Sequence, residues 1–128
     1  MEKIYTSKAP AAIGSYSQAI VANGFLFTSG QIPIIPETGE IIAGGIKEQA
    51  KQVMKNLNAI FEEAGTNFNL AVKTTCFLQD MEDFAAFNEV YGEYFKNTPA
   101  RSCVAVKELP KKVICEVEVI AVLKNYNE

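Results

Sequence analysis

Charged and reactive side chains are concentrated in one stretch of the sequence, residues 99–119. Four residues of this stretch carry the chemistry considered first: Arg101, Cys103, Glu116 and Glu118. An arginine guanidinium can bind a carboxylate through two parallel hydrogen bonds, and a glutamate can hold a water molecule and accept its proton. Brought together by the fold, these groups could bind a small acid and exchange protons with it.

The same stretch predicts two β-strands, residues 101–107 and 113–123, which are joined by a short loop as a hairpin. The odd positions of the second strand are all apolar, so they form its core face. When the core faces of the two strands are aligned, Arg101 and Cys103 of the first strand lie on the outer face, together with the two glutamates of the second. A shift by one residue would bury Arg101 without a partner, which is costly.

This pattern leaves two interpretations of Arg101 open. It could form an ion pair with Glu116 or Glu118, across the strands or between subunits. Alternatively, the charges could form a functional site. Strand parity does not distinguish the two glutamates, because both lie on the same face.

The composition limits which residues can act as acids, bases or metal ligands. The chain has 128 residues, which is typical of one domain, 1–128, and it contains no histidine. Any general acid or base must therefore be Glu, Asp, Tyr, Cys, Lys or water, and we expect no metal, because a transition-metal site would lack its commonest ligand. The net charge is −3 and the longest basic run is Lys111-Lys112, so nucleic-acid binding is not expected.

The three cysteines all lie in apolar strand patterns. An odd number of such cysteines favours a reducing compartment, and we find no signal peptide or membrane-spanning run, so we expect a cytoplasmic protein. We assign Cys76 and Cys115 to the core. Cys103 is interpreted as a small strand residue rather than a nucleophile, because no histidine is available to activate it.

The remaining patterns predict an α+β fold. A hairpin is expected around Asn23-Gly24, followed by an amphipathic helix from Ile46 to Ala64, a central strand at 70–78 and a second helix between Asp80 and Pro99. With the last two strands, this order predicts a single mixed six-stranded sheet with two helices on one face.

The first hairpin contributes a second group of polar residues. Its two-residue turn pairs Ala22 with Phe25, so Gln18 faces Ser29, and Tyr16 should point the same way. Gly30 marks a bulge or a place where the backbone approaches another group closely.

Two helices cover only one face of such a sheet. We expect the other face to be half apolar, with Ile114, Ile120, Val122, Cys103 and Ala105 on it. An apolar face without a cover in its own chain predicts a subunit interface, and hence a homo-oligomer.

Several motifs, taken in their order, closely resemble the RidA (YjgF) family over nearly the whole chain. They are APAAIGSYSQ at 9–18, FTSGQIP at 27–33, ETGE at 37–40, VKTTCFLQD at 72–80, DFAAFNEVY at 83–91, PARSCV at 99–104 and ICEVEVIAV at 114–122. The resemblance implies a chorismate-mutase-like fold and a homotrimer with clefts between subunits. It also implies hydrolysis, without a cofactor, of 2-imino acids and their enamine tautomers, such as 2-iminobutanoate and 2-iminopropanoate, to 2-oxo acids and ammonia.

The resemblance also assigns roles to individual residues. Arg101 matches the arginine that binds the substrate carboxylate, and Glu116, not Glu118, matches the carboxylate that activates water. The other positions match substrate-binding residues, with a backbone contact at the cysteine: Cys103, Tyr16, Ser29, Gly30 and Asn88.

The sequence departs from the family pattern at two places. Ser15 replaces a common proline, and the link at 94–99 is short, with Thr98 where an aromatic residue is common. Two other functions stay open: an endoribonuclease or translation inhibitor, and a non-enzymatic module that binds 2-oxo acids.

Overall fold

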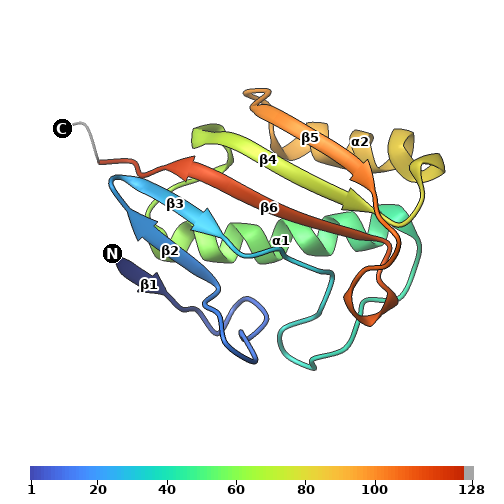
Figure 1. Ribbon diagram of the computed structural model, residues 1–128, viewed down its shortest axis with the longest axis horizontal. Helices are drawn as coiled ribbons and strands as arrows, with labels where there is room; N and C mark the ends of the chain where they lie inside the picture. Colours follow the sequence, from blue (N-terminus) through green and yellow to red (C-terminus); the bar gives the residue numbers. More distant parts are fainter. Residues whose placement is uncertain (126–128) are drawn as a thin grey trace.

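The computed structural model describes residues 1–125 and contains one sheet with two long helices on one face (Figure 1). The expected domain range also includes 126–128, which lie outside the described residues. The strand order is β1-β2-β3-β6-β4-β5, and only β4 and β5 are parallel. The strands are β1 (Glu2–Ile4), β2 (Ala19–Ala22), β3 (Phe25–Thr28), β4 (Ala71–Leu78), β5 (Ala100–Ala105) and β6 (Cys115–Val122). The predicted α+β class, with a mixed six-stranded sheet and two helices on one face, is confirmed.

The two helices are α1 (Ile46–Ala64) and α2 (Phe84–Tyr94). Helix α1 begins where the Gly45 amide donates to the Glu48 carboxylate at 2.9 Å, and it ends at Gly65, whose φ of 88° is left-handed. Short 3₁₀ turns precede β4, α2 and β6, and they span Phe68–Leu70, Met81–Asp83 and Pro110–Lys112. None of the helices within residues 1–125 is long and apolar enough to span a membrane.

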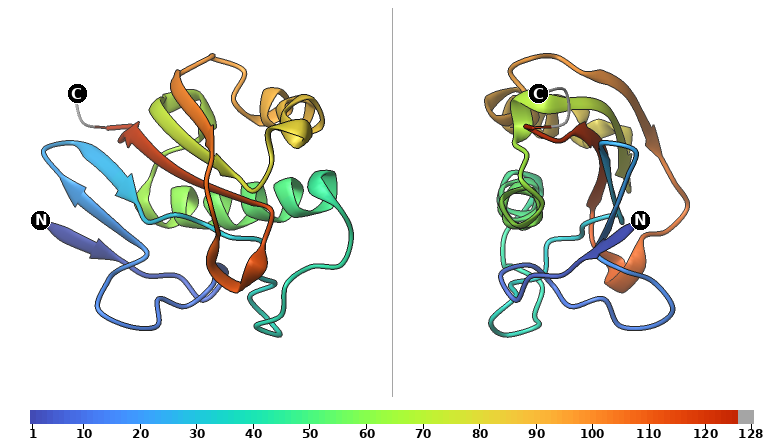
Figure 2. Two further views of the ribbon diagram at one scale, coloured as in Figure 1. Left: turned by 45° about the vertical axis from the view of Figure 1, so that its right-hand side comes forward. Right: turned by 90° about the vertical axis from the view of Figure 1, so that its left-hand side faces the viewer.

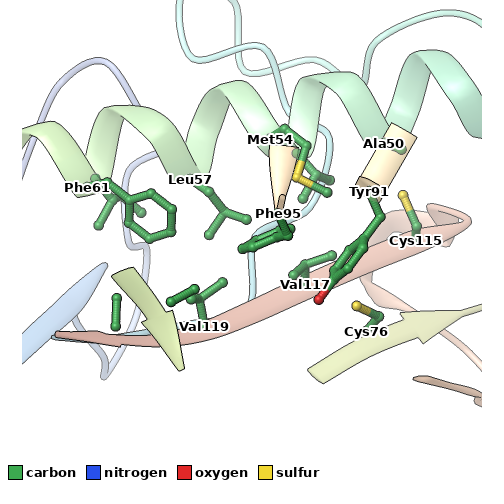
Figure 3. Packing of buried hydrophobic residues seen from close by; sticks show 14 of the residues in the cluster. Ala50, Met54, Leu57, Phe61, Cys76, Tyr91, Phe95, Cys115, Val117 and Val119 are labelled. Atoms are coloured by element: carbon green, nitrogen blue, oxygen red, sulfur yellow. The ribbon is translucent and has the colours of Figure 1, made fainter. Parts of the chain in front are cut away.

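The core lies between the helices and the sheet (Figure 3). Helix α1 contributes its apolar stripe, including Met54, Leu57 and Phe61, which are fully buried. This stripe packs over the alternate residues Val117 and Val119 of β6. Since side chains alternate along a strand, the residues between them must point to the opposite face.

The hairpin at Asn23-Gly24 forms as predicted. Ala22 pairs with Phe25, and both turn residues have positive φ, 53° and 81°, as a type I′ turn requires. The Ser29 amide donates to the Gln18 carbonyl at 2.9 Å, so this pair extends the same register.

The predicted hairpin between strands 101–107 and 113–123 is wrong. These segments form β5 and β6, but β4 lies between them in the sheet (Figures 1 and 2). The chain instead makes a β4–α2–β5 unit, in which the helix crosses over and returns β5 parallel to β4. Packing of α2 on the sheet, rather than the short loop after β5, decides which strand neighbours β5.

The predicted grouping of Arg101 and Cys103 with the two glutamates is therefore wrong as well. Arg101 pairs with the buried Thr74 in the β4–β5 register, and Cys103 pairs with the buried Cys76, so both lie on the helix side. Ala105 also faces this side, because it pairs with Leu78. The cost of burial does not apply to Arg101, since β5 is an edge strand and the guanidinium extends past the core along α2.

The opposite face of the sheet has no cover from its own chain in residues 1–125. Phe25 and Phe27 are 37% and 41% exposed there, next to Val122 and Ile120, and Val104 on β5 is 45% exposed. The expectation of a half-apolar open face is thus confirmed, but Val104 lies on it, whereas Cys103 and Ala105 lie on the helix side.

Candidate active site

Two hollows of about 550 Å³ each contain the predicted site residues other than Cys103, and they share no lining residue. The first surrounds Arg101 beside α2, and the second surrounds Glu116 on the open face of the sheet. The first is lined by Asn88, Tyr91, Gly92, Phe95, Lys96, Thr98, Pro99 and Arg101. The second is lined by Pro10, Ala11, Ile13, Tyr16, Gln18, Ser29, Gly30, Gln31, Ile32, Ile34, Pro110, Lys111 and Glu116.

Arg101 is held by neutral groups. Its Nη1 donates to the Asn88 side-chain oxygen at 2.6 Å, and the guanidinium carbon lies 4.6 Å from the centre of the Tyr91 ring and 5.4 Å from that of Phe84. Within residues 1–125, the only ion pair joins Lys47 to Glu89, so Arg101 has no carboxylate partner. An ion pair of Arg101 with Glu116 or Glu118 is absent from the described chain. The remaining guanidinium N–H groups can bind an anion.

Glu116 projects from β6 into the second hollow and is half-buried. Burial raises the pKa of its carboxyl above the ordinary value, and the nearby Glu118 carboxylate adds to the rise. A carboxylate of raised pKa is a better proton acceptor near neutral pH than an ordinary glutamate. Glu116 thus has the properties of a general base.

Gly30 allows this position of Glu116. A Cβ at residue 30 would lie 1.9 Å from Oε2 of Glu116, far inside any normal contact. The close approach predicted at Gly30 is therefore confirmed, and the approaching group is the Glu116 carboxylate.

The hairpin residues complete the wall around Glu116. The Ser29 hydroxyl donates to the Ser17 carbonyl at 2.6 Å, and the exposed Tyr16 lies at the rim. The side-chain nitrogen of Gln18 donates to the carbonyls of Thr6 and Pro10 at 3.0 and 2.8 Å, which fixes the loop that leads to Tyr16. Tyr16, Gln18 and Ser29 line one hollow.

Cys103 lies on the helix side with Arg101 and packs against the core. Burial raises the pKa of its thiol, which lowers the thiolate fraction. This agrees with its interpretation as a small strand residue rather than a nucleophile.

Sequence reasoning missed two residues near Arg101. The sequence patterns place Tyr91 only within the second predicted helix and Thr74 only within the predicted strand at 70–78, yet their hydroxyls share a buried hydrogen bond of 2.8 Å and the Tyr91 ring contacts Arg101. The signal was available, because Tyr91 follows Asn88 by three residues and so lies on the same helix face.

The comparisons with known proteins identify the family. The family model described as endoribonuclease L-PSP matches residues 6–123. The chain belongs to this family. The resemblance to RidA (YjgF) proteins, predicted from the motifs, is confirmed, since a Rid family protein from Yersinia pestis has the same fold with a TM-score of 0.92 and 48% identity over 95% of this chain and 98% of that one.

Relatives within the L-PSP family carry several names. A RutC family protein from Pyrococcus abyssi is 57% identical over 94% of this chain and 95% of its own length. The 2-iminobutanoate/2-iminopropanoate deaminase of Rattus norvegicus is 49% identical, with 93% of this chain and 88% of the relative covered. The structure of E. coli TdcF with bound serine has a TM-score of 0.90 and 44% identity, with 95% and 98% covered.

The geometry sets one condition on any activity of this L-PSP family chain. Arg101 and Glu116 lie on opposite sides of the sheet and in separate hollows. A small substrate cannot contact both groups of one chain. If both act on one molecule, they must come from two copies.

Proposed function

We propose that this protein hydrolyses 2-imino acids and their enamine tautomers, including 2-iminobutanoate and 2-iminopropanoate, to 2-oxo acids and ammonia. The observation that carries the proposal is the Arg101 guanidinium, which is oriented by Asn88 and Tyr91 and has no carboxylate partner in residues 1–125. Such a group suits the carboxylate of a small acid. The mammalian relative named as a deaminase for these two imines supports the choice of reaction.

The proposed site combines the Arg101 hollow of one copy with the Glu116 hollow of the next. The half-apolar open face of the sheet supports assembly into a closed ring, and we propose a homotrimer with clefts between subunits. In each cleft, Arg101 and Asn88 come from one copy, and Glu116, Ser29, Gly30 and Tyr16 come from its neighbour.

The chemistry needs no metal, cofactor or covalent nucleophile, because the C=N carbon of a protonated imine is already electrophilic. Arg101 binds the carboxylate and fixes that carbon in place. Glu116 accepts a proton from water as the water oxygen bonds to the carbon. The protonated Glu116 then gives this proton to the nitrogen. As the C–N bond breaks and the C=O bond forms, the hydroxyl proton passes to Glu116 and from it to the departing ammonia, so ammonium and the 2-oxo acid leave.

The direct assay generates 2-iminobutanoate with a threonine dehydratase and traps it with semicarbazide. The protein should shorten the lifetime of the imine, and Arg101→Ala and Glu116→Gln should each abolish this effect. Glu118→Gln is the matched control, because it changes the neighbouring glutamate on the same face and should stay active. An Arg101→Ala variant as fast as wild type contradicts the proposal.

Mixed oligomers test whether the site is shared between copies. When Arg101→Ala and Glu116→Gln chains are co-expressed in equal amounts, about a quarter of the clefts should contain both intact groups. Activity should return to about that fraction of wild type. If both groups acted within one chain, no mixed oligomer would recover activity.

The description of the family model favours one further candidate, an endoribonuclease. The net charge of −3 weakens this candidate, because binding to RNA is driven largely by contacts with its phosphates. Cleavage of RNA that copurifies with the oligomer and disappears in Glu116→Gln would support it. Binding of 2-oxobutanoate without turnover of imines would instead indicate a metabolite-binding module. In either deaminase or binding role, we expect the protein to act in the cytoplasm.

A further inference from the structure

Arg101 extends from an edge strand, where a long side chain is ordinarily free to adopt many rotamers. Here three contacts restrict it: the hydrogen bond to Asn88 and the contacts with the rings of Tyr91 and Phe84. The hydrogen bond fixes one nitrogen. The guanidinium carbon lies over the Tyr91 ring, 4.6 Å from its centre, and closer to it than to the centre of the Phe84 ring.

Tyr91 is itself held firmly. It is 6% exposed and stacks on Phe95, with ring centres 4.6 Å apart and planes inclined by 27°. Its hydroxyl shares a hydrogen bond of 2.8 Å with the hydroxyl of Thr74, which is fully buried. Thr74 is also the strand partner of Arg101 in the β4–β5 register. The three residues therefore form a closed set of contacts between β4, α2 and β5.

We propose that Tyr91 and Thr74 are positioning residues that orient the Arg101 guanidinium for binding of a carboxylate. The proposal rests on the proposed function, since it concerns the same substrate group. Bidentate binding requires the guanidinium plane to align with the carboxylate plane. The Tyr91 ring covers a face of the guanidinium and leaves its edge to the ligand, and Thr74 fixes the ring.

A single arginine makes this proposal directly measurable. Arg101 is the only arginine in the sequence, so protein labelled with ¹⁵N-arginine gives one side-chain Nε–H signal. The nearby Tyr91 ring shifts this signal away from its position in a free arginine. Titration with 2-oxobutanoate, followed on the signal of the intact oligomer, gives a Kd that does not depend on turnover.

Variants of Tyr91 and Thr74 distinguish the effect of the Tyr91 ring on ligand binding from the effect of its hydroxyl. Tyr91→Leu removes the ring and should raise the Kd for 2-oxobutanoate and the KM for the imine about tenfold, with kcat changed by less than about threefold. Tyr91→Phe keeps the ring and should bind within about threefold of wild type. Thr74→Val leaves the Tyr91 hydroxyl buried without a partner and should weaken binding, whereas adding Tyr91→Phe to Thr74→Val should restore it.

Tyr94→Leu is the matched control, because Tyr94 lies on the same helix and packs at a tilt against Phe68 instead of Arg101. It should leave the arginine signal and the Kd unchanged. If Tyr94→Leu weakens binding as much as Tyr91→Leu does, the effect is only on helix stability and the proposal is overturned. Should Tyr91→Leu not fold, Thr74→Val and its rescue by Tyr91→Phe decide the question alone.

These measurements distinguish a failure of the proposed function from a failure of the positioning role alone. Wild-type protein that neither binds 2-oxobutanoate nor shortens the lifetime of the imine refutes the proposed function. Active wild-type protein whose Kd and arginine signal are unchanged in Tyr91→Leu and Thr74→Val refutes only the positioning role.

Discussion

Substituting Gly30 tests whether the position of the Glu116 carboxylate controls activity. The Cβ of an alanine at residue 30 would lie 1.9 Å from Oε2, 2.8 Å from Cδ and 3.1 Å from Cγ of Glu116. The φ of Gly30 is outside the left-handed region, so the backbone accepts alanine. Glu116 has a flexible side chain, and the clash should be relieved by movement of its carboxylate.

The size of the effect follows from this displacement. The carboxylate must retreat by about 1 Å or more to regain a normal contact, and a misplacement of this size costs roughly 10²-fold in rate. We therefore expect kcat/KM for imine hydrolysis to fall about 100-fold in Gly30→Ala. Stability should stay within about 1 kcal/mol of wild type, because alanine also reduces the entropy of the unfolded chain.

The assay is semicarbazide trapping of the imine, with urea unfolding measured on the same samples. Gly45→Ala is the control, since its Cβ would lie 3.8 Å from the nearest atom, Oε1 of Glu48, and it should keep full activity. The double variant Gly30→Ala with Glu116→Gln should be no slower than Glu116→Gln alone, because both changes act on one group. A Gly30→Ala protein with activity within threefold of wild type would refute this argument.

Four further predictions concern pH and stability. Because Glu116 must be ionised to accept a proton and its pKa is raised, kcat/KM should fall in acid at a higher pH than for an ordinary glutamate, and Glu118→Gln should move this limb to lower pH. Because the pKa of Glu116 is higher in the folded protein than in the unfolded chain, the folded protein loses stability as pH rises through this pKa. Glu116→Gln removes the charge and should therefore raise the urea midpoint at neutral pH. This increase should vanish below pH 4.5, where the glutamate is protonated in both states. Phe61→Ala should lower the free energy of unfolding in urea by about 3–5 kcal/mol, since this ring is fully buried and packs edge-on against Phe68. Asn56→Leu should cost about 3 kcal/mol in the same measurement, because it leaves the Ile34 carbonyl without its donor and the buried Gln52 amide without its acceptor; an unchanged urea midpoint would contradict this.

Local patterns in the sequence specify most of the helices and strands and limit which residues can act as acids or bases. The Asn23-Gly24 turn set the register of the first hairpin, because only a few turn types match the strand twist. The spacing of apolar residues and Gly65 marked the extent of α1. The absence of histidine limited the general bases, and the ordered motifs led to the correct family.

The order of the strands in the sheet, and with it the face on which each site residue lies, depends on tertiary packing. Alternation along β5 and β6 shows that each strand has two faces, but it does not show which strand lies beside which. Packing of α2 placed β4 between them and turned Arg101 to the helix side, away from Glu116. A charge is tolerated on that side because β5 is an edge strand, where the guanidinium packs on Tyr91 instead of being buried without a partner. Long-range packing, which no local pattern encodes, therefore separates the two halves of the proposed site and requires a second copy to complete it.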